Sequence, residues 1–70
     1  MERMIATHNG IEIFTDQNEN RKAVYTKKPI YESGGRFIVM TGNVDASTRL
    51  AMREIDKMPP HIVESNYSAG

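Results

Sequence analysis

The segment RFIVMTGNVDASTRLAMREIDK, residues 36–57, decides the fold because its hydrophobic rhythm changes at Gly42. Residues 36–41 are β-branched, aromatic and almost continuously apolar, which is typical of a strand. Such a run predicts a central strand that is covered on at least one face. Beyond Gly42 the apolar residues recur with the period of a helix as far as Pro59. The segment therefore predicts a sheet followed by a single helix.

The helix is predicted over about residues 44–57. Asn43 or Asp45 can cap its N-terminus, and Pro59 disfavours helical geometry in the residue before it. The apolar side recurs at i, i+4, i+7, i+11 and i+14 and is expected to face the core. Its members are Val44, Thr48, Ala51, Ile55 and Met58, flanked by Leu50 and Met52.

Asn9-Gly10 is the strongest two-residue hairpin signal in the chain. A type I′ turn needs positive φ at both central positions, which Asn tolerates and Gly adopts freely. A two-residue turn also sets the register of the strands that it joins. The predicted cross-strand pairs are His8 with Ile11, Thr7 with Glu12, Ala6 with Ile13, Ile5 with Phe14 and Met4 with Thr15.

The middle of the chain offers weaker signals. Residues 16–20 are wholly polar and predict a loop or a wide turn. Residues 23–26 predict a strand, and Pro29, which cannot donate to a ladder, predicts an edge position, a bend or a break. Residues 30–32 continue the strand weakly, and residues 33–35 predict a turn.

These elements predict an α+β fold, in which a small antiparallel sheet of three to four strands packs against one C-terminal α-helix. We expect residues 1–64 to form a single domain, with 61–64 as a candidate short strand and 65–70 as a flexible tail. The expected core consists of Ile11, Ile13, Val39, Phe37 or Ile38, Ala51 and Ile55.

The composition is that of an ordinary small domain, with 39% hydrophobic and 26% charged residues over 70 positions. Because there is no cysteine, neither disulfides nor thiolate metal sites can supplement the core. No apolar run is long enough for a signal peptide or a membrane span. We therefore expect a cytoplasmic protein without membrane association.

Positive charge gathers in the middle of the chain, although nine basic and nine acidic residues cancel overall. Lys and Arg can neutralise phosphates while aromatic faces stack on bases, which is how some sheet surfaces hold nucleic acid. The alternative is that the cations protect a sheet edge and the tyrosines complete the core. The candidate contacts, for nucleic acid or for a protein partner, are Arg21, Lys22, Tyr25, Lys27, Lys28, Tyr31 and Arg36.

A second candidate surface lies on the predicted helix. Arg49, Arg53 and Lys57 recur at i, i+4 and i+8 and form a basic stripe opposite the apolar side. Such a stripe can follow a phosphate backbone or an acidic partner. Because Glu54 and Asp56 flank it closely, a solvated helix face is the favoured interpretation.

No motif specifies catalysis, a cofactor or a metal. The polar run 16–20 resembles the start of a calcium loop, but Arg21 and Lys27 stand where that loop needs glycine and a bidentate glutamate. His8 and His61 are far apart in sequence, and nothing places a nucleophile beside a base. We therefore expect no catalytic, cofactor-binding or metal-binding residues, and no enzyme activity.

Two function classes remain. The favoured one is a non-enzymatic interaction protein, an adaptor, inhibitor or regulatory subunit of the kind that bacterial and phage genomes often encode, which docks on a protein partner. Its support is small size, neutral charge and five methionines, which adapt well at contact surfaces. The second is a small nucleic-acid-binding domain that uses the basic hairpin, residues 21–36. An exposed sheet edge, at the Pro29 strand or at 61–64, also offers a route to homodimerisation.

Overall fold

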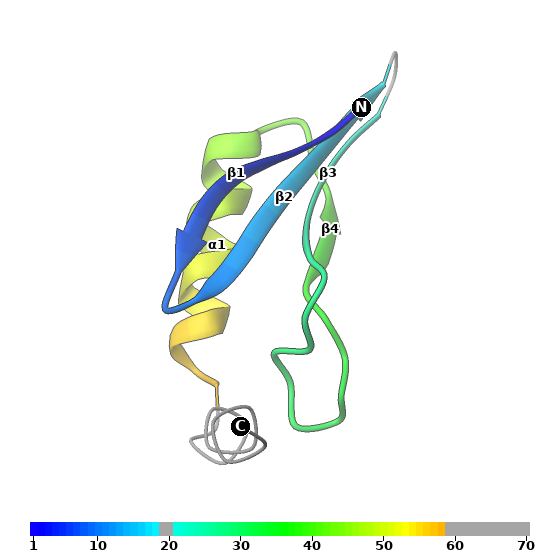
Figure 1. Ribbon diagram of the computed structural model, residues 1–70. Coiled ribbons are helices and arrows are strands. Elements are labelled where there is room, and N and C mark those ends of the chain that lie inside the picture. The colour runs from blue at the N-terminus through cyan, green and yellow to red at the C-terminus, as the bar shows by residue number, and fades with distance from the viewer. Residues whose placement is uncertain (19–20, 59–70) are drawn as a thin grey trace.

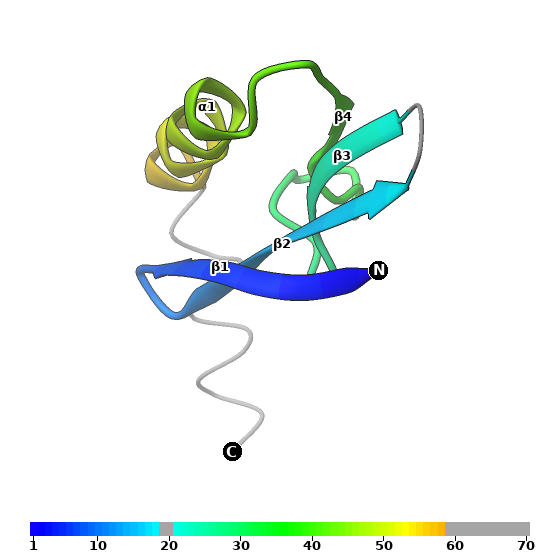
Figure 2. The same ribbon diagram turned by 90° about the horizontal axis from the view of Figure 1, so that it is seen from above.

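The computed structural model describes residues 1–18 and 21–58, and within them it contains four strands and one helix. The strands form one antiparallel sheet in the order β1-β2-β3-β4, and the helix packs on one of its faces (Figures 1 and 2). This is the predicted α+β architecture. No helix in the described part of the chain is long and apolar enough to cross a membrane. The elements are β1 (Glu2–His8), β2 (Ile11–Asn18), β3 (Arg21–Thr26), β4 (Ile38–Met40) and α1 (Val44–Asp56).

The first hairpin turns at Asn9 and Gly10, as predicted. Both residues have positive φ, 50° and 80°, which a type I′ turn requires. The predicted register is confirmed next to the turn, where His8 pairs with Ile11 and Ala6 pairs with Ile13. The turn therefore sets the pairing over the first few residues of each strand.

Farther from the turn the predicted register is wrong. Met4 pairs with Phe14 rather than with Thr15, and Ile5 has no direct partner, because the register shifts between Met4 and Ala6. The extra residue is a β-bulge in an edge strand, a common place for one. The bulge moves Met4 to the face of the sheet that carries Phe14.

The strand β2 continues to Asn18, so the predicted loop over residues 16–20 is wrong for its first part. Asp16, Gln17 and Asn18 pair with residues of β3 and remain exposed. Their polarity reflects this exposure, because the far end of the β2–β3 hairpin extends beyond the core. Residues 19 and 20 of the predicted loop lie outside the described residues.

The strand β4 is an edge strand, so the prediction of a central strand at 36–41 is wrong. It is only three residues long, and Ile38 and Met40 are each 57% exposed. The helix packs against β1, β2 and β3. Among the described residues the sheet therefore has its edges at β1 and β4, and not beside Pro29, where an edge was one of the predicted alternatives.

The chain between β3 and β4 forms a loop, so the weak strand predicted at 30–32 is also wrong. Pro29 lies in this loop, where the predicted break occurs. The loop is closed by the backbone N–H of Ile30, which donates to the carbonyl of Gly35 at 2.9 Å. Ile30 is almost fully buried, at 1% exposure, and it anchors the loop in the core.

The core lies between the helix and the inner face of the sheet. The Asn43 side chain accepts a hydrogen bond from the Ala46 N–H at 3.0 Å, so Asn43 is the N-cap. The helix buries Ala51 and Ile55 as predicted, together with Ser47, whereas Leu50 is exposed. The buried hydrophobic residues are Ile11, Ile13, Val24, Ile30, Phe37, Ala51 and Ile55, with Val39 packed against them.

Several sequence-based predictions concern residues 59–70, which the structure does not describe. The candidate strand at 61–64, the tail at 65–70 and the domain boundary at 64 all lie outside the described residues.

Candidate functional site

The most distinctive surface is the outer face of the sheet, the face opposite α1. Along β2, Ile11, Ile13 and Thr15 are buried beneath the helix, so the alternate residues, Phe14 among them, point to the outer face. Direct cross-strand pairing then connects Met4 with Phe14, Phe14 with Tyr25 and Tyr25 with Ile38. One continuous line of large side chains therefore crosses all four strands. We call this line the apolar row: Met4, Phe14, Tyr25 and Ile38.

The two rings at the centre of the apolar row are stacked. The ring centroids of Phe14 and Tyr25 lie 5.9 Å apart, with an interplanar angle of 21°. The Lys27 ammonium lies 4.3 Å from the Phe14 centroid, within the range of a cation–π contact. Its nitrogen also lies 2.8 Å from Oε1 of Glu2. The centre of the outer face is thus held by contacts between side chains of β1, β2 and the end of β3.

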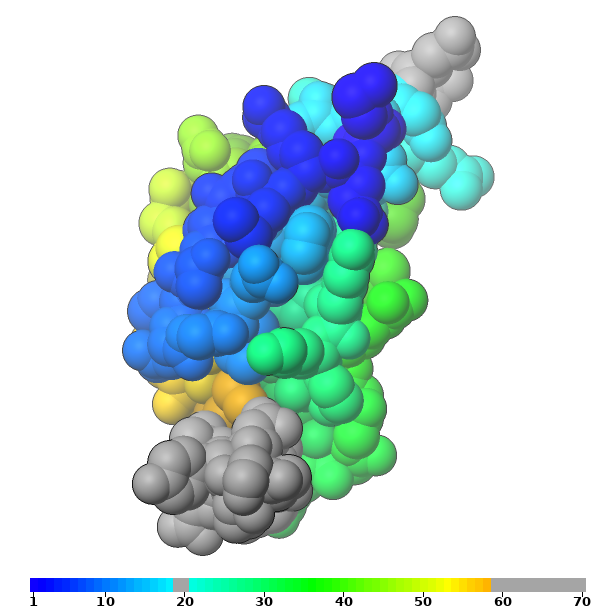
Figure 3. Space-filling view, in the orientation of Figure 1, coloured from blue at the N-terminus to red at the C-terminus, as the bar shows by residue number. Residues whose placement is uncertain are grey.

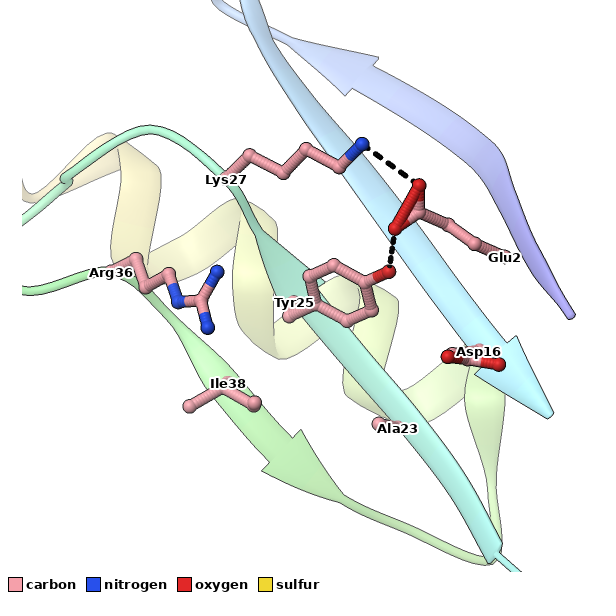
Figure 4. A pocket seen from close by; sticks show the side chains of 7 residues that line it. All are labelled: Glu2, Asp16, Ala23, Tyr25, Lys27, Arg36 and Ile38. Carbon is pink, nitrogen blue, oxygen red and sulfur yellow. Dashed lines mark hydrogen bonds and ion pairs between the residues drawn. The ribbon is translucent and has the colours of Figure 1, made fainter. Parts of the chain in front are cut away.

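The Tyr25 hydroxyl donates a hydrogen bond to the other carboxylate oxygen of Glu2 (Figure 4). The hydrogen bond from Lys27, followed by the one from Tyr25, lowers the pKa of Glu2. The same contact with Glu2 raises the pKa of Tyr25 to about 12. At neutral pH this arrangement therefore keeps a carboxylate beside a protonated phenol.

A shallow hollow of about 550 Å³ lies beside the apolar row. Within the described part of the chain, the Arg36 side chain makes no hydrogen bond or ion pair. Figure 4 shows its guanidinium reaching toward Tyr25 from the side of β4. The hollow therefore combines an aromatic and aliphatic floor with one cation that is available to a ligand. Its lining residues are Glu2, Asp16, Ala23, Tyr25, Lys27, Arg36 and Ile38.

The structure brings together three of the seven candidate contacts from the basic hairpin. Tyr25, Lys27 and Arg36 line the same hollow. Arg21 and Lys22 lie at the other end of β3 and line a separate depression with Met40 and Thr41. Lys28 is exposed in the loop after β3.

Tyr31 lies apart from Tyr25. Its hydroxyl donates to Glu54 of the helix at 3.2 Å. Burial, and secondarily this hydrogen bond, raises the pKa of Tyr31. The two candidate tyrosines therefore serve different parts of the molecule, with Tyr25 on the outer face of the sheet and Tyr31 bracing the loop against α1.

The basic stripe on the helix is solvated. Arg49 and Arg53 are exposed, and Lys57 pairs with Glu54 at 3.1 Å. This hydrogen bond from Lys57 is the main cause of the lowered pKa of Glu54. The stripe is thus partly neutralised by its own helix.

Sequence reasoning missed the acidic side of the outer face and most of the apolar row. Glu2 and Asp16 reach the hollow from β1 and β2, and both precede the basic hairpin in the sequence. The turn at Asn9-Gly10 contained the necessary signal, because pairing outward from it brings β1 alongside β2. The β-bulge at Ile5, however, could not be predicted from the sequence. It is the reason that Met4 pairs with Phe14 in the apolar row.

The described residues contain no group of three or more His, Cys, Asp or Glu side chains that could hold a metal ion. His8 instead contacts Asp56 at 2.7 Å, at the end of the first hairpin. The chemical groups that the outer face presents are stacked rings, exposed aliphatic groups and a guanidinium.

The comparisons with known proteins add no family to this description. No family model, no curated protein and no solved structure matches the chain.

Proposed function

We propose that the protein is a small non-enzymatic interaction protein that docks on a protein partner through the outer face of its sheet. The observation that carries the proposal is the apolar row, which crosses all four strands on the face opposite α1. Figure 3 shows the molecule from the side on which β1 and β2 lie in front of the helix. The ends of the apolar row are exposed, at 51% for Met4 and 57% for Ile38. Burying such side chains against a partner is favourable, at about 25 cal/mol per Å² of apolar area.

The chemistry of the outer face also fits a protein partner. Aromatic residues, methionine and arginine are enriched at protein–protein interfaces, and all three occur here. The charges of Glu2 and Lys27 already satisfy each other, so a partner need not supply counter-charges for them. Arg36 has no counter-charge among the described residues, and a carboxylate is its best bidentate acceptor.

The proposed partner therefore presents an apolar side chain beside an Asp or Glu. The apolar side chain would sit against Tyr25 and Ile38, and the carboxylate would reach Arg36. We propose the cytoplasm as the compartment, which suits a small domain whose sequence has no cysteine.

A capture experiment with matched variants tests the proposal. The tagged protein is used to capture partners from a bacterial lysate, with and without nuclease treatment. Met4→Glu places a charge in the apolar row, and Arg36→Glu reverses the cation of the hollow. Leu50→Glu is the control, because Leu50 is a comparably exposed apolar residue, at 41%, on the helix side of the molecule.

The expected result is a nuclease-resistant set of proteins that the parent and Leu50→Glu capture and that Met4→Glu and Arg36→Glu lose. Capture that is identical for all four proteins would overturn docking through the outer face. Capture that disappears after nuclease treatment would favour nucleic acid.

Nucleic-acid binding by the basic hairpin is the second candidate function. It is favoured by Arg21 and Lys22, whose side chains line their own depression and make no hydrogen bond or ion pair with another described residue. It ranks second because Glu2 and Asp16 line the hollow that holds Tyr25, Lys27 and Arg36. Because Glu2 already pairs with Lys27, the hollow offers phosphates fewer unpaired cations.

A further inference from the structure

The free edge of β4 exposes backbone groups that have no partner within the described chain. The Thr26 N–H donates to the Phe37 carbonyl at 2.9 Å, and the Thr41 N–H donates to the Lys22 carbonyl at 2.8 Å. In an antiparallel pair, residues that exchange hydrogen bonds alternate with residues that do not. Residues 37, 39 and 41 therefore direct their backbone groups toward β3. The N–H and C=O groups of Ile38 and Met40 point away from the sheet.

The two edges of the sheet differ in how they resist pairing. At the β1 edge a bulge interrupts the strand, and Glu2 and Arg3 bring charge. Bulges and charges are standard devices against edge-to-edge association. The β4 edge has neither, because Ile38, Val39 and Met40 are all uncharged and apolar. Its composition is that of a strand with neighbours on both sides, which is why the sequence predicts a central strand there.

We propose that two copies of the chain pair antiparallel through β4, around a twofold axis at Val39. In this register Ile38 lies opposite Met40 of the partner subunit, and Met40 lies opposite Ile38 of the partner subunit. Because both residues direct their backbone groups outward, each N–H meets a carbonyl across the axis. The dimer would hold β4 between β3 and its symmetry-related copy.

The side chains are self-complementary in this register. Ile38 and Met40 are each 57% exposed in the single chain, and their side chains meet on the outer face of the dimer. On the opposite face Val39 meets its own copy. Arg36 falls opposite Gly42 of the partner subunit, so no like charges face each other directly. This contact is isologous, which means that both subunits use the same surface. The assembly therefore stops at two copies.

The inferred dimer does not rest on the proposed docking function. Pairing at the edge leaves the outer face uncovered and joins the apolar rows of the two subunits. Because β4 is short, the contact is small, and small contacts give weak complexes. We expect a dimer that forms toward the upper end of the micromolar range.

Sedimentation velocity of the full chain from about 10 µM to 1 mM tests the dimer. The expected result for the parent is a concentration-dependent shift from monomer to dimer. The double variant Ile38→Lys/Met40→Lys should remain monomeric, because lysines would face each other across the axis. The double variant Met4→Lys/Leu50→Lys is the control, since it adds the same charge at two exposed apolar residues away from β4. It should dimerise like the parent.

Charge complementation tests the register. Ile38→Glu/Met40→Glu should also be monomeric alone. An equimolar mixture with Ile38→Lys/Met40→Lys should form a heterodimer, because each lysine then faces a glutamate. The mixture of the glutamate variant with the Met4→Lys/Leu50→Lys control should not form a heterodimer.

Amide exchange locates the contact. At about 1 mM, where about half of the chain or more is expected to be dimeric, the amides of Ile38 and Met40 should exchange at least about twofold more slowly than in the dilute monomer. The amides of residues 37, 39 and 41 point toward β3 in both states. A monomer at about 1 mM would overturn the proposal. So would a dimer that survives the lysine variant, or one that leaves the Ile38 and Met40 amides unprotected.

Discussion

The imidazole Nε2 of His8 lies 2.7 Å from Oδ1 of Asp56, which ties the end of β1 to the last residue of α1. The Asn9 side-chain amide donates to the same oxygen at 3.0 Å. An acidic residue in the last turn of a helix is normally unfavourable, because the carboxylate meets the negative end of the helix dipole. The contacts with His8 and Asn9 offset that effect and attach the helix to the hairpin turn.

A double-mutant cycle measures the interaction between His8 and Asp56. His8→Ala and Asp56→Ala should each lower the free energy of unfolding slightly, with a coupling energy of about 0.5–1 kcal/mol at near-neutral pH. Chemical denaturation of the two single variants and the double variant gives the coupling. Thr7→Ala combined with Asp56→Ala is the control, because Thr7 makes no described hydrogen bond to Asp56, and its effects should add. Additive effects for His8 and Asp56 as well would show that the contact contributes nothing.

The hairpin turn depends on the positive φ of Gly10 rather than on space around it. A Cβ built at Gly10 meets no atom within 4 Å, but its φ is +80°. Gly10→Ala should therefore lower the free energy of unfolding by about 1 kcal/mol through backbone strain alone. Gly42→Ala is the matched control, since Gly42 has equally open space and no positive φ. Thermal denaturation should show a lower Tm only for the variant at Gly10.

Ile55, which is 2% exposed, has the largest of the three buried side chains of the helix. Ile55→Ala should lower the free energy of unfolding by about 2–5 kcal/mol, because it removes buried area and leaves a cavity. That is a large part of a small domain's stability. Leu50→Ala, on the exposed side of the same helix, should change it by less than about 0.5 kcal/mol. Similar losses for the two variants in urea denaturation would contradict the helix orientation.

The pair of Tyr25 and Glu2 predicts a pH dependence with a definite sign. The pKa of Tyr25 rises from 10 to about 12 on folding. Its contribution to stability is therefore complete below pH 10 and is lost as the pH rises from about 10 to 12. The pKa of Glu2 falls below its usual 4.5. Its contribution is present above pH 4.5 and is lost as the pH falls through the lowered value.

Ultraviolet titration of the phenol absorbance checks this pair. In the parent, Tyr25 should ionise near pH 12, and Glu2→Gln should bring its pKa back toward 10, because the neighbouring anion is gone. The same variant should reduce the loss of stability in acid. Tyr25→Phe identifies which transition belongs to Tyr25. An unchanged titration in Glu2→Gln would show that the hydrogen bond does not form.

Local signals in the sequence predicted the elements, whereas tertiary contacts decided their details. The turn at Asn9 and Gly10 could be predicted because few residues adopt positive φ. The helix face is readable from the spacing of Ala51 and Ile55. The burial of Ile30 is not readable, because an apolar residue within a loop carries no period.

Tertiary contacts also limited how much of the candidate functional site could be predicted from the sequence. Tyr25, Lys27 and Arg36 could be grouped as a basic and aromatic cluster because they are close in sequence. Glu2, which pairs with both Tyr25 and Lys27, joins them only through the register of β1 on β2. A bulge of one residue changes that register, so the charge balance of the outer face could not be predicted.

That charge balance supports a prediction about nucleic acid. Because Glu2 neutralises Lys27 and Asp16 faces the same hollow, we expect no detectable binding of DNA or RNA at about 10 µM protein in moderate salt, measured by fluorescence anisotropy.

If the basic hairpin does bind phosphates, affinity should fall steeply with salt, with a log–log slope of about −0.9 per neutralised phosphate on duplex DNA. Lys27→Ala/Lys28→Ala should then reduce the magnitude of that slope by about two, and Arg49→Ala/Arg53→Ala, which removes the same charge from the helix, should leave it unchanged. Tight, salt-sensitive binding with this pattern would contradict docking on a protein as the main function and would favour the basic hairpin.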